Sequence, residues 1–290
     1  MYLTYVSKAD EAEAVARNIV AAGGKACAFR LDVADAEAVA AFFKERIKDQ
    51  VELDVLVNNA STISAPHPFL EHTINDLEEA LHSGLYGTWQ MMQLCFPYMK
   101  EHGGSIINFG SIGGVNGLEG FAAYAAEKEA IRGLSRVVAR EWGQFGIRVN
   151  CVCPNVITDR FEEGIHQSPK EIQEYLIGNM SQNAMHRPGK AYEDFTPAAL
   201  FLASEDSRWV TGQTSMWRAA PGSPPESASS TRKHRQGSGH RKSPLRAKAR
   251  RGFLGRSKSK RIQGITYRLL DFLQMPIFSA EAISSSRNWG

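Results

Sequence analysis

The sequence predicts an α/β fold built on a doubly wound, Rossmann-like and mostly parallel sheet. Short apolar segments alternate with amphipathic segments of helical length up to about residue 217. Glycine pairs stop two of these helical segments, at Gly23-Gly24 and Gly103-Gly104. The chain has 290 residues, of which 43% are hydrophobic, enough for one full domain. Strands that alternate with helices in this way form a parallel sheet covered on both faces.

The elements are expected in a regular order along the chain. The apolar strand segments are "MYLTYV", "ACAFRLDV", "LDVLVNNA", "GSIINFGS", "IRVNCVCP" and "GQTSMW". The helical segments are expected at about 9–22, 35–49, 74–101, 122–143, 169–180 and 192–204. Ligands of such sheets bind at the carboxyl ends of the strands. This places the candidate site at "LDV", "NNA", "FGS" and "CPNVITD".

The charge distribution divides the chain into a folded part and a tail. Residues 219–290 contain 15 Lys and Arg against three Asp and Glu, whereas residues 1–218 contain 19 against 28. We therefore expect a domain over residues 1–217 and a basic, low-complexity tail over 218–290 that is mostly disordered. The tail carries no nucleic-acid reader motif, so nucleic-acid binding is expected only as a nonspecific contact of this tail.

The cysteines and the apolar runs indicate a cytoplasmic protein. Cys151 and Cys153 lie two apart in a predicted strand, so both face the same side and are expected to be buried thiols. No apolar run reaches the length of a membrane span, and the N-terminus lacks the features of a signal peptide. No metal ligands are predicted.

One helix carries a tyrosine and a lysine four residues apart, in "YAAEK" at 124–128. Tyr124 and Lys128 share a helix face, although this spacing alone has little specificity. The ordered series "LDVLVNNAS", "GSIINFGSIGG", "YAAEK", "GIRVNCVCPNVITD" and "FLASEDSRWVTGQT" resembles the short-chain dehydrogenase/reductase family. The resemblance is to the classical type, similar to carbonyl or 3-oxoacyl reductases. It implies an NAD(P)-dependent oxidoreductase that interconverts a secondary alcohol and a ketone.

The resemblance also implies three catalytic residues. Ser111 precedes Tyr124 by 13 residues, as in the family. Tyr124 would be the acid/base, and Ser111 would hold the substrate oxygen. Lys128 would bind the nicotinamide ribose and lower the pKa of the Tyr124 phenol toward neutrality.

Other matches concern the cofactor. Ser7 and Lys8 follow the first strand where a carboxylate would select NAD, so they favour the 2′-phosphate of NADP. The remaining predicted contacts are Asp32 and Val33 at the adenine, Asn58 and Ala60 at the strand end, and Pro154, Ile157 and Thr158 near the nicotinamide. Family members are usually homodimers or homotetramers, and Trp89, Met92, Phe96, Leu134 and Val138 suit either such an interface or the core.

The sequence departs from the family pattern at three places. No glycine-rich turn precedes residue 23, so the first central strand and phosphate-binding turn are expected to be missing and the sheet divided. Gly84 stands where the family has a catalytic asparagine, for which His82 or Ser83 could substitute. The pattern also ends abruptly after "SMW". The alternative function is therefore a truncated, inactive relative, acting as an interaction protein or arising as a defective gene product. The substrate cannot be inferred from the expected lid at 160–187.

Overall fold

A computed structural model describes residues 1–47, 52–63, 66–166 and 170–220 of the chain. The predicted basic tail lies almost wholly outside these residues. None of the helices in the described part combines the length and the apolar character needed to cross a membrane.

The main sheet has four parallel strands in the order β3-β4-β5-β8. These strands are β3 (Val55–Asn58), β4 (Gly104–Phe109), β5 (Ile147–Pro154) and β8 (Thr214–Trp217). Their register aligns Asn58 with Asn108, and Asn108 with Cys151. The carboxyl ends of the strands therefore meet at one edge, as the sequence predicted.

A second parallel sheet is formed by β1 (Tyr2–Tyr5) and β2 (Cys27–Arg30). Within the described residues, no ladder of hydrogen bonds joins this pair to the main sheet. The prediction of a divided sheet is confirmed. A third, short pair, β6 (Val156–Ile157) and β7 (Gly189–Lys190), was not predicted.

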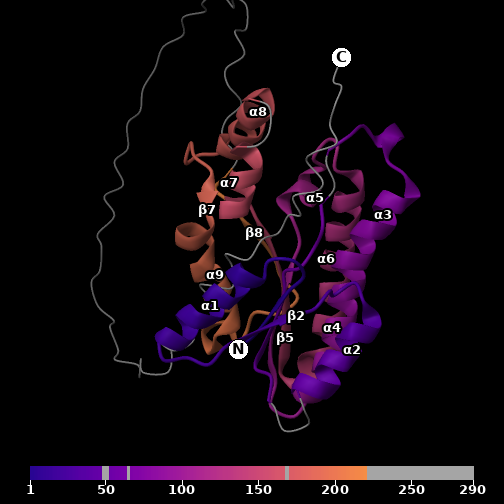
Figure 1. The fold of residues 1–290 in the computed structure, drawn as a ribbon, viewed down its shortest axis with the longest axis vertical. Coiled ribbons are helices and arrows are strands. Elements are labelled where there is room, and N and C mark those ends of the chain that lie inside the picture. The colour runs from indigo at the N-terminus through magenta and orange to yellow at the C-terminus, as the bar shows by residue number, and fades with distance from the viewer. Residues whose placement is uncertain (48–51, 64–65, 167–169, 221–290) are drawn as a thin grey trace, which may run out of the picture.

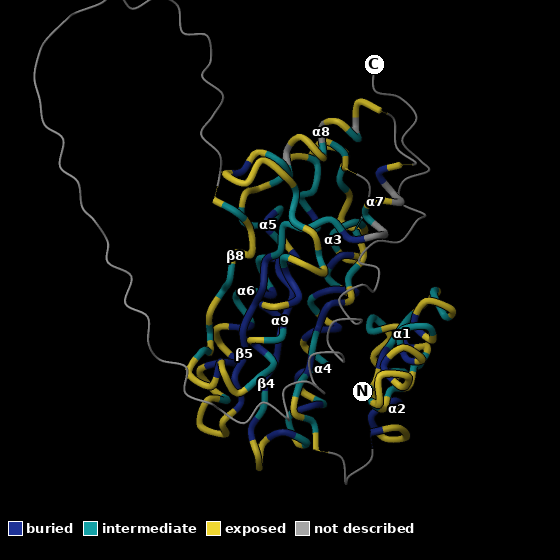
Figure 2. Tube along the Cα trace, turned by 90° about the vertical axis from the view of Figure 1, so that its left-hand side faces the viewer, coloured by how far each residue is buried: buried dark blue, intermediate teal, exposed yellow. Residues whose placement is uncertain are grey.

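Helices cover both faces of the main sheet (Figures 1 and 2). α4 (Gly87–Cys95) and α6 (Ala122–Trp142) pack on one face, and α9 (Thr196–Ala203) packs on the other. Successive side chains of β4 point to opposite faces. Ile106 thus joins the cluster with Met92 and Val138, while Ile107 joins the cluster with Phe195.

The N-terminal pair of strands is attached to the rest of the domain through a shared core. α1 (Ala9–Ala21) packs on Leu3 of β1 in a small cluster of its own. On the opposite face, α2 (Ala36–Phe42) and the π-helical turn Phe43–Ile47 belong to the same cluster as Met92 and Ile106. Side-chain packing therefore connects the two sheets where backbone hydrogen bonds do not.

The long helix predicted at 74–101 is segmented. It consists of α3 (Ile74–Ala80), a π-helical turn (Leu81–Tyr86), α4 and a 3₁₀ turn (Phe96–Tyr98). Among the described residues, α5 (Ile112–Asn116) and α7 (Asp159–His166) were not predicted, whereas α8 (Lys170–Ser181) corresponds to the helix expected at 169–180.

Candidate active site

The carboxyl edge of the main sheet is held by a buried polar network. The Asn58 side-chain amide donates to Asn108 Oδ1 at 2.8 Å, and the Asn108 amide donates to Ser135 Oγ at 2.9 Å. All three side chains are buried. Because each buried polar group has a partner, the network fixes the ends of β3 and β4 relative to α6. Asn58 therefore supports the end of the sheet through its side chain.

The structure brings the three predicted catalytic residues together. Ser111 follows β4 and caps the N-terminus of α5, where its Oγ accepts from Gly113 N at 3.0 Å. Tyr124, in the first turn of α6, is close enough to the Ser111 side chain for that hydroxyl to lower the pKa of its phenol. Lys128 Nζ lies 5.4 Å from the centre of the Tyr124 ring. Ser111 and Lys128 are 17 positions apart in the sequence. The turn before α6 reverses the chain direction and brings the three side chains close together.

A fourth residue, Glu127, belongs to the site and was missed. Glu127 and Lys128 form an ion pair at 3.0 Å, with side chains 0% and 3% exposed respectively. The Ser61 hydroxyl donates to the Glu127 carboxylate at 3.2 and 3.3 Å. The sequence offered one indication of this residue, a carboxylate directly before the lysine in "YAAEK". The burial of Glu127 could not be predicted, because it depends on a contact with a distant segment.

That distant segment is the π-helical turn that contains Gly84. A Cβ added at Gly84 would lie 1.6 Å from Glu127 Oε1, so only glycine leaves room for the carboxylate. Neither residue suggested as a substitute for the family's asparagine occupies this place. His82 is exposed and pairs with Glu78 at 3.8 Å, while Ser83 Oγ lies 2.6 Å from Thr62 Oγ1. Glu127 occupies the space above Gly84.

Lys128 lowers the pKa of the Tyr124 phenol, as expected, but the net pKa is raised and does not move toward neutrality. Burial is the largest influence and raises the pKa of the Tyr124 phenol above its ordinary value. The Lys128 charge and the Ser111 hydrogen bond oppose this effect, but the nearby Glu127 carboxylate adds to it. Burial alone would lower the pKa of Lys128, yet the charges of Glu127 and Tyr124 hold it above its ordinary value. Tyr124 is therefore a phenol and Lys128 an ammonium at neutral pH.

The predicted adenosine contacts lie at the ends of β1 and β2. Ser7 is exposed, and Lys8 Nζ forms an ion pair with Glu11 at 2.6 Å. Asp32 Oδ1 accepts from Ala34 N at 2.9 Å in the turn before α2. Val33 lies against the main domain, because a Cβ added at Gly87 would come within 2.9 Å of Val33 Cγ2.

The predicted nicotinamide contacts follow β5. Pro154 ends this strand, Ile157 pairs with Lys190, and Thr158 is buried with its Oγ1 accepting from Phe161 N at 3.2 Å. Ala60, after β3, is exposed. The polar groups therefore lie at two places that suit the two ends of a dinucleotide. The Lys8 ammonium and the Ser7 hydroxyl follow β1, and the groups of Tyr124, Lys128 and Ser111 lie at the carboxyl edge of the main sheet. No glycine cradle for a pyrophosphate lies between β1 and α1.

Comparison with known proteins places the chain among carbonyl-acting oxidoreductases. A family model described as enoyl-(acyl carrier protein) reductase matches residues 1–217. The chain is 37% identical over 179 residues to a 12alpha-hydroxysteroid dehydrogenase from a Clostridium species, covering 59% of this chain and 68% of that protein. It is 32% identical over 213 residues to the 3-oxoacyl-[acyl-carrier-protein] reductase FabG of Staphylococcus aureus, covering 73% and 83%.

A solved structure, that of levodione reductase, has a similar fold. Its TM-score is 0.68 at 26% sequence identity, with 75% of this chain and 85% of that chain covered. The similarity therefore extends over the described domain and agrees with the family match.

Proposed function

The chain belongs to the short-chain dehydrogenase/reductase family of oxidoreductases, and from this membership we propose that it interconverts a secondary alcohol and a ketone with a nicotinamide cofactor. The observation that carries the proposal is the meeting of Ser111, Tyr124 and Lys128 at the carboxyl edge of the sheet. The nicotinamide would supply the hydride for the carbonyl carbon. The chain's own residues would supply the proton and the charge stabilisation.

Each side chain has a role that its geometry supports. The Ser111 hydroxyl would donate a hydrogen bond to the substrate carbonyl oxygen and stabilise the charge that develops there. Tyr124 would donate its proton to the same oxygen as the alcohol forms. Lys128 would then stabilise the Tyr124 phenolate, since its ammonium lies beside the ring. In the oxidative direction the same groups act in reverse.

Turnover assays with the purified chain test this function. We expect oxidation of NADPH or NADH with 3-oxoacyl thioesters, cyclic ketones or oxosteroids, the substrate classes suggested by the relatives' names. Ser111→Ala should lower kcat by about 10²-fold, because one oxyanion donor is lost. A wild-type chain that binds neither cofactor and turns over no substrate would instead support the inactive relative.

The raised pKa of Tyr124 gives the reaction a characteristic pH dependence. A group that stays protonated through the neutral range is ready to act as an acid, so the reduction rate should be flat there and decline only at alkaline pH. Oxidation needs the phenolate and should rise by about tenfold per pH unit below the pKa of Tyr124. Measuring kcat in both directions against pH checks this. An oxidation rate that is already level at neutral pH would contradict it.

We propose NADP as the preferred cofactor, with Ser7 and Lys8 at the 2′-phosphate. Lys8→Ala should weaken NADPH binding by about tenfold, because a charge-assisted hydrogen bond is lost. Glu11→Gln is the matched control: it releases Lys8 from its 2.6 Å ion pair and should tighten NADPH binding. NADH affinity should change in neither variant. Fluorescence titration measures both, and equal loss of NADH and NADPH binding in Lys8→Ala would count against this assignment.

A homodimer or homotetramer built on α4 and α6 is also proposed. Met92 and Val138 are buried in the core, so they cannot contribute, but Trp89 is 50% and Val137 54% exposed. Trp89→Glu should reduce the mass seen by light scattering, whereas an unchanged mass would exclude this helix face. The cysteines are all free thiols, which suits the cytoplasmic location that we propose.

A further inference from the structure

Glu127 connects the interior of the site to its surface. Its side chain is fully buried between Lys128 on one side and Ser61 on the other. Ser61 is only partly buried. A continuous path therefore runs from Tyr124 through Lys128 and Glu127 to the outside of the domain. Each step after Tyr124 is an ion pair or a hydrogen bond.

We propose that Glu127 is the positioning and proton-relay residue through which Lys128 regains protons from solvent by way of Ser61. The inference rests on the proposed function, because it concerns how Tyr124 is reprotonated after each reduction. The Lys128 ammonium would donate a proton to the Tyr124 phenolate, and the Lys128 amine would then regain a proton from Glu127, whose carboxylate takes one from water at Ser61. One water proton enters and hydroxide remains outside, so the step balances.

Two features of the site favour a relay over a purely structural ion pair. Burial is the largest influence on Glu127 and raises the pKa of its carboxyl, despite the opposing Lys128 charge. A carboxyl with a raised pKa takes up and releases a proton nearer to neutral pH. The second feature is the space at Gly84, which admits the carboxylate directly beside the lysine. A buried pair with no functional role is often replaceable by apolar groups.

Glu127→Gln tests the relay because it keeps the shape of the side chain and removes the proton acceptor. We expect kcat to fall by at least about tenfold while KM for the cofactor stays within about twofold. Glu127→Ala beside Gly84 opens a space for a small acid, so formate should restore part of the rate. Ser61→Ala leaves the ion pair intact and should reduce kcat less. An unchanged kcat in folded Glu127→Gln would overturn the proposal.

A second readout separates this inference from the proposed function. The Tyr124 phenol can be titrated by its ultraviolet absorbance without any substrate. Because the Glu127 charge raises the pKa of Tyr124, Glu127→Gln should shift this titration to lower pH. An unchanged titration would refute the coupling even if the enzyme is active. Absent turnover with a shifted titration would reject the proposed function and retain the coupling of Glu127 to Tyr124.

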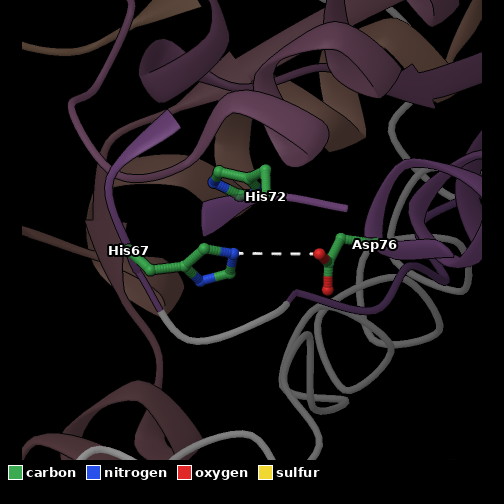
Figure 3. A group of neighbouring side chains, drawn as sticks. All are labelled: His67, His72 and Asp76. Atoms are coloured by element: carbon green, nitrogen blue, oxygen red, sulfur yellow. Dashed lines mark ion pairs between the residues drawn. The ribbon is translucent and has the colours of Figure 1, made fainter. Parts of the chain in front are cut away.

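An independent cluster lies in the segment before and within α3. His67, His72 and Asp76 each offer one ligand atom, and these atoms lie within 4.8 Å of one another (Figure 3). The two rings are 3.8 Å apart at their centres, and His67 Nε2 lies 3.9 Å from Asp76 Oδ2. The cluster shares no residue with the proposed active site.

His72 has the hydrogen-bonding arrangement of a metal ligand. Its Nε2 lies 3.2 Å from the carbonyl oxygen of Gly120, which can only accept. The proton is therefore assigned to Nε2, which leaves a lone pair on Nδ1. This Nδ1 is buried and has no hydrogen-bond partner. Histidines that bind metals commonly donate their other N–H to a backbone carbonyl in this way.

Asp76 completes a donor set for a cation. Its Oδ2 accepts from Thr73 N at 2.6 Å and from Thr73 Oγ1 at 2.8 Å. These hydrogen bonds hold the Asp76 carboxylate in place, and an aspartate is ordinarily an anion at neutral pH. We infer that His67, His72 and Asp76 bind a divalent transition cation of the zinc type. Two imidazoles and a carboxylate are ligands that this ion accepts. Ligand atoms around zinc lie about 3.3 Å apart, so small side-chain rotations must bring the three atoms closer together when the ion binds.

Calorimetric titration with Zn²⁺ tests the site without any enzyme activity. We expect one strong site per chain that is weakened by at least about tenfold in His72→Ala. His82→Ala is the matched control, since His82 also faces a carboxylate at 3.8 Å but on an exposed helix turn. Absorption of the Co²⁺ form should show nitrogen and oxygen ligands. Unchanged affinity in His72→Ala, no binding, or a thiolate charge-transfer band would overturn the inference.

Discussion

Replacing Tyr124 with phenylalanine is expected to lower kcat by about 10²–10⁴-fold, the range for loss of a general acid. The substitution removes only the hydroxyl, which lies near the Ser111 side chain. The ring remains against Lys128, so the fold and cofactor affinity should change little. Steady-state kinetics in the reductive direction, with the cofactor Kd measured separately, checks the expectation.

Tyr192→Phe is the matched control for this change. Tyr192 is 50% exposed and lies outside the site, so removal of its hydroxyl should leave kcat unaffected. Equal rates in Tyr124→Phe and the wild type would exclude Tyr124 as the proton donor. The assignment of the other two catalytic residues would then lose its basis.

Lys128→Met is expected to be the most destabilising single change at the site. It leaves the Glu127 carboxylate buried without its cation, and breaking a buried pair in this way costs about 3–5 kcal/mol in the free energy of unfolding. Glu127 cannot move into solvent, because its side chain is 0% exposed. Urea unfolding at neutral pH, followed by tryptophan fluorescence, measures the loss.

The pH dependence of this variant identifies the cause. Glu127 has its pKa raised by burial, and the loss of Lys128 raises it further. The folded state then binds the proton more tightly than the unfolded state, so stability is greatest below the unfolded pKa and falls as pH rises through the folded pKa. The deficit of Lys128→Met should therefore shrink toward acidic pH.

The double variant Lys128→Met/Glu127→Gln provides the thermodynamic control. It removes both charges, and it should recover much of the stability that Lys128→Met loses. A deficit that is independent of pH and persists in the double variant would show that lost packing of the lysine stem is responsible instead.

The sequence predicted the elements whose pattern is local. α6 was expected at 122–143 and is found at Ala122–Trp142, because its apolar face repeats with helical period over six turns. β5 was predicted with its observed bounds, since its mostly apolar, short segment follows the glycine that ends the preceding helix. Cys151 and Cys153 are buried thiols, as expected.

The features that escaped prediction depend on contacts between distant segments. Glu127 was not singled out from the sequence, because its burial depends on its fit against Gly84, 43 positions away. Burial is the main cause of the raised pKa of Tyr124, and the Glu127 charge that this contact places nearby adds to it. The π-helical turns and the two-residue strands β6 and β7 are too short to leave a periodic signal.

The divided sheet has a consequence for how a dinucleotide could be held. Asp32 and Val33 belong to the β1–β2 pair, whereas Tyr124 and Lys128 belong to the four-stranded body. Packing of α2 against the main domain, the contact of Val33 with Gly87 and a hydrogen bond from Gln90 Nε2 to the Ala36 carbonyl at 2.7 Å set the distance between these two groups. If that packing is lost in some of the molecules, only the molecules that hold both groups in the binding arrangement can bind the whole cofactor. The apparent affinity for the cofactor is then reduced in proportion to their fraction. A cofactor that contacts both the β1–β2 pair and the four-stranded sheet would then hold the two sheets together, and its binding would make the whole domain more rigid.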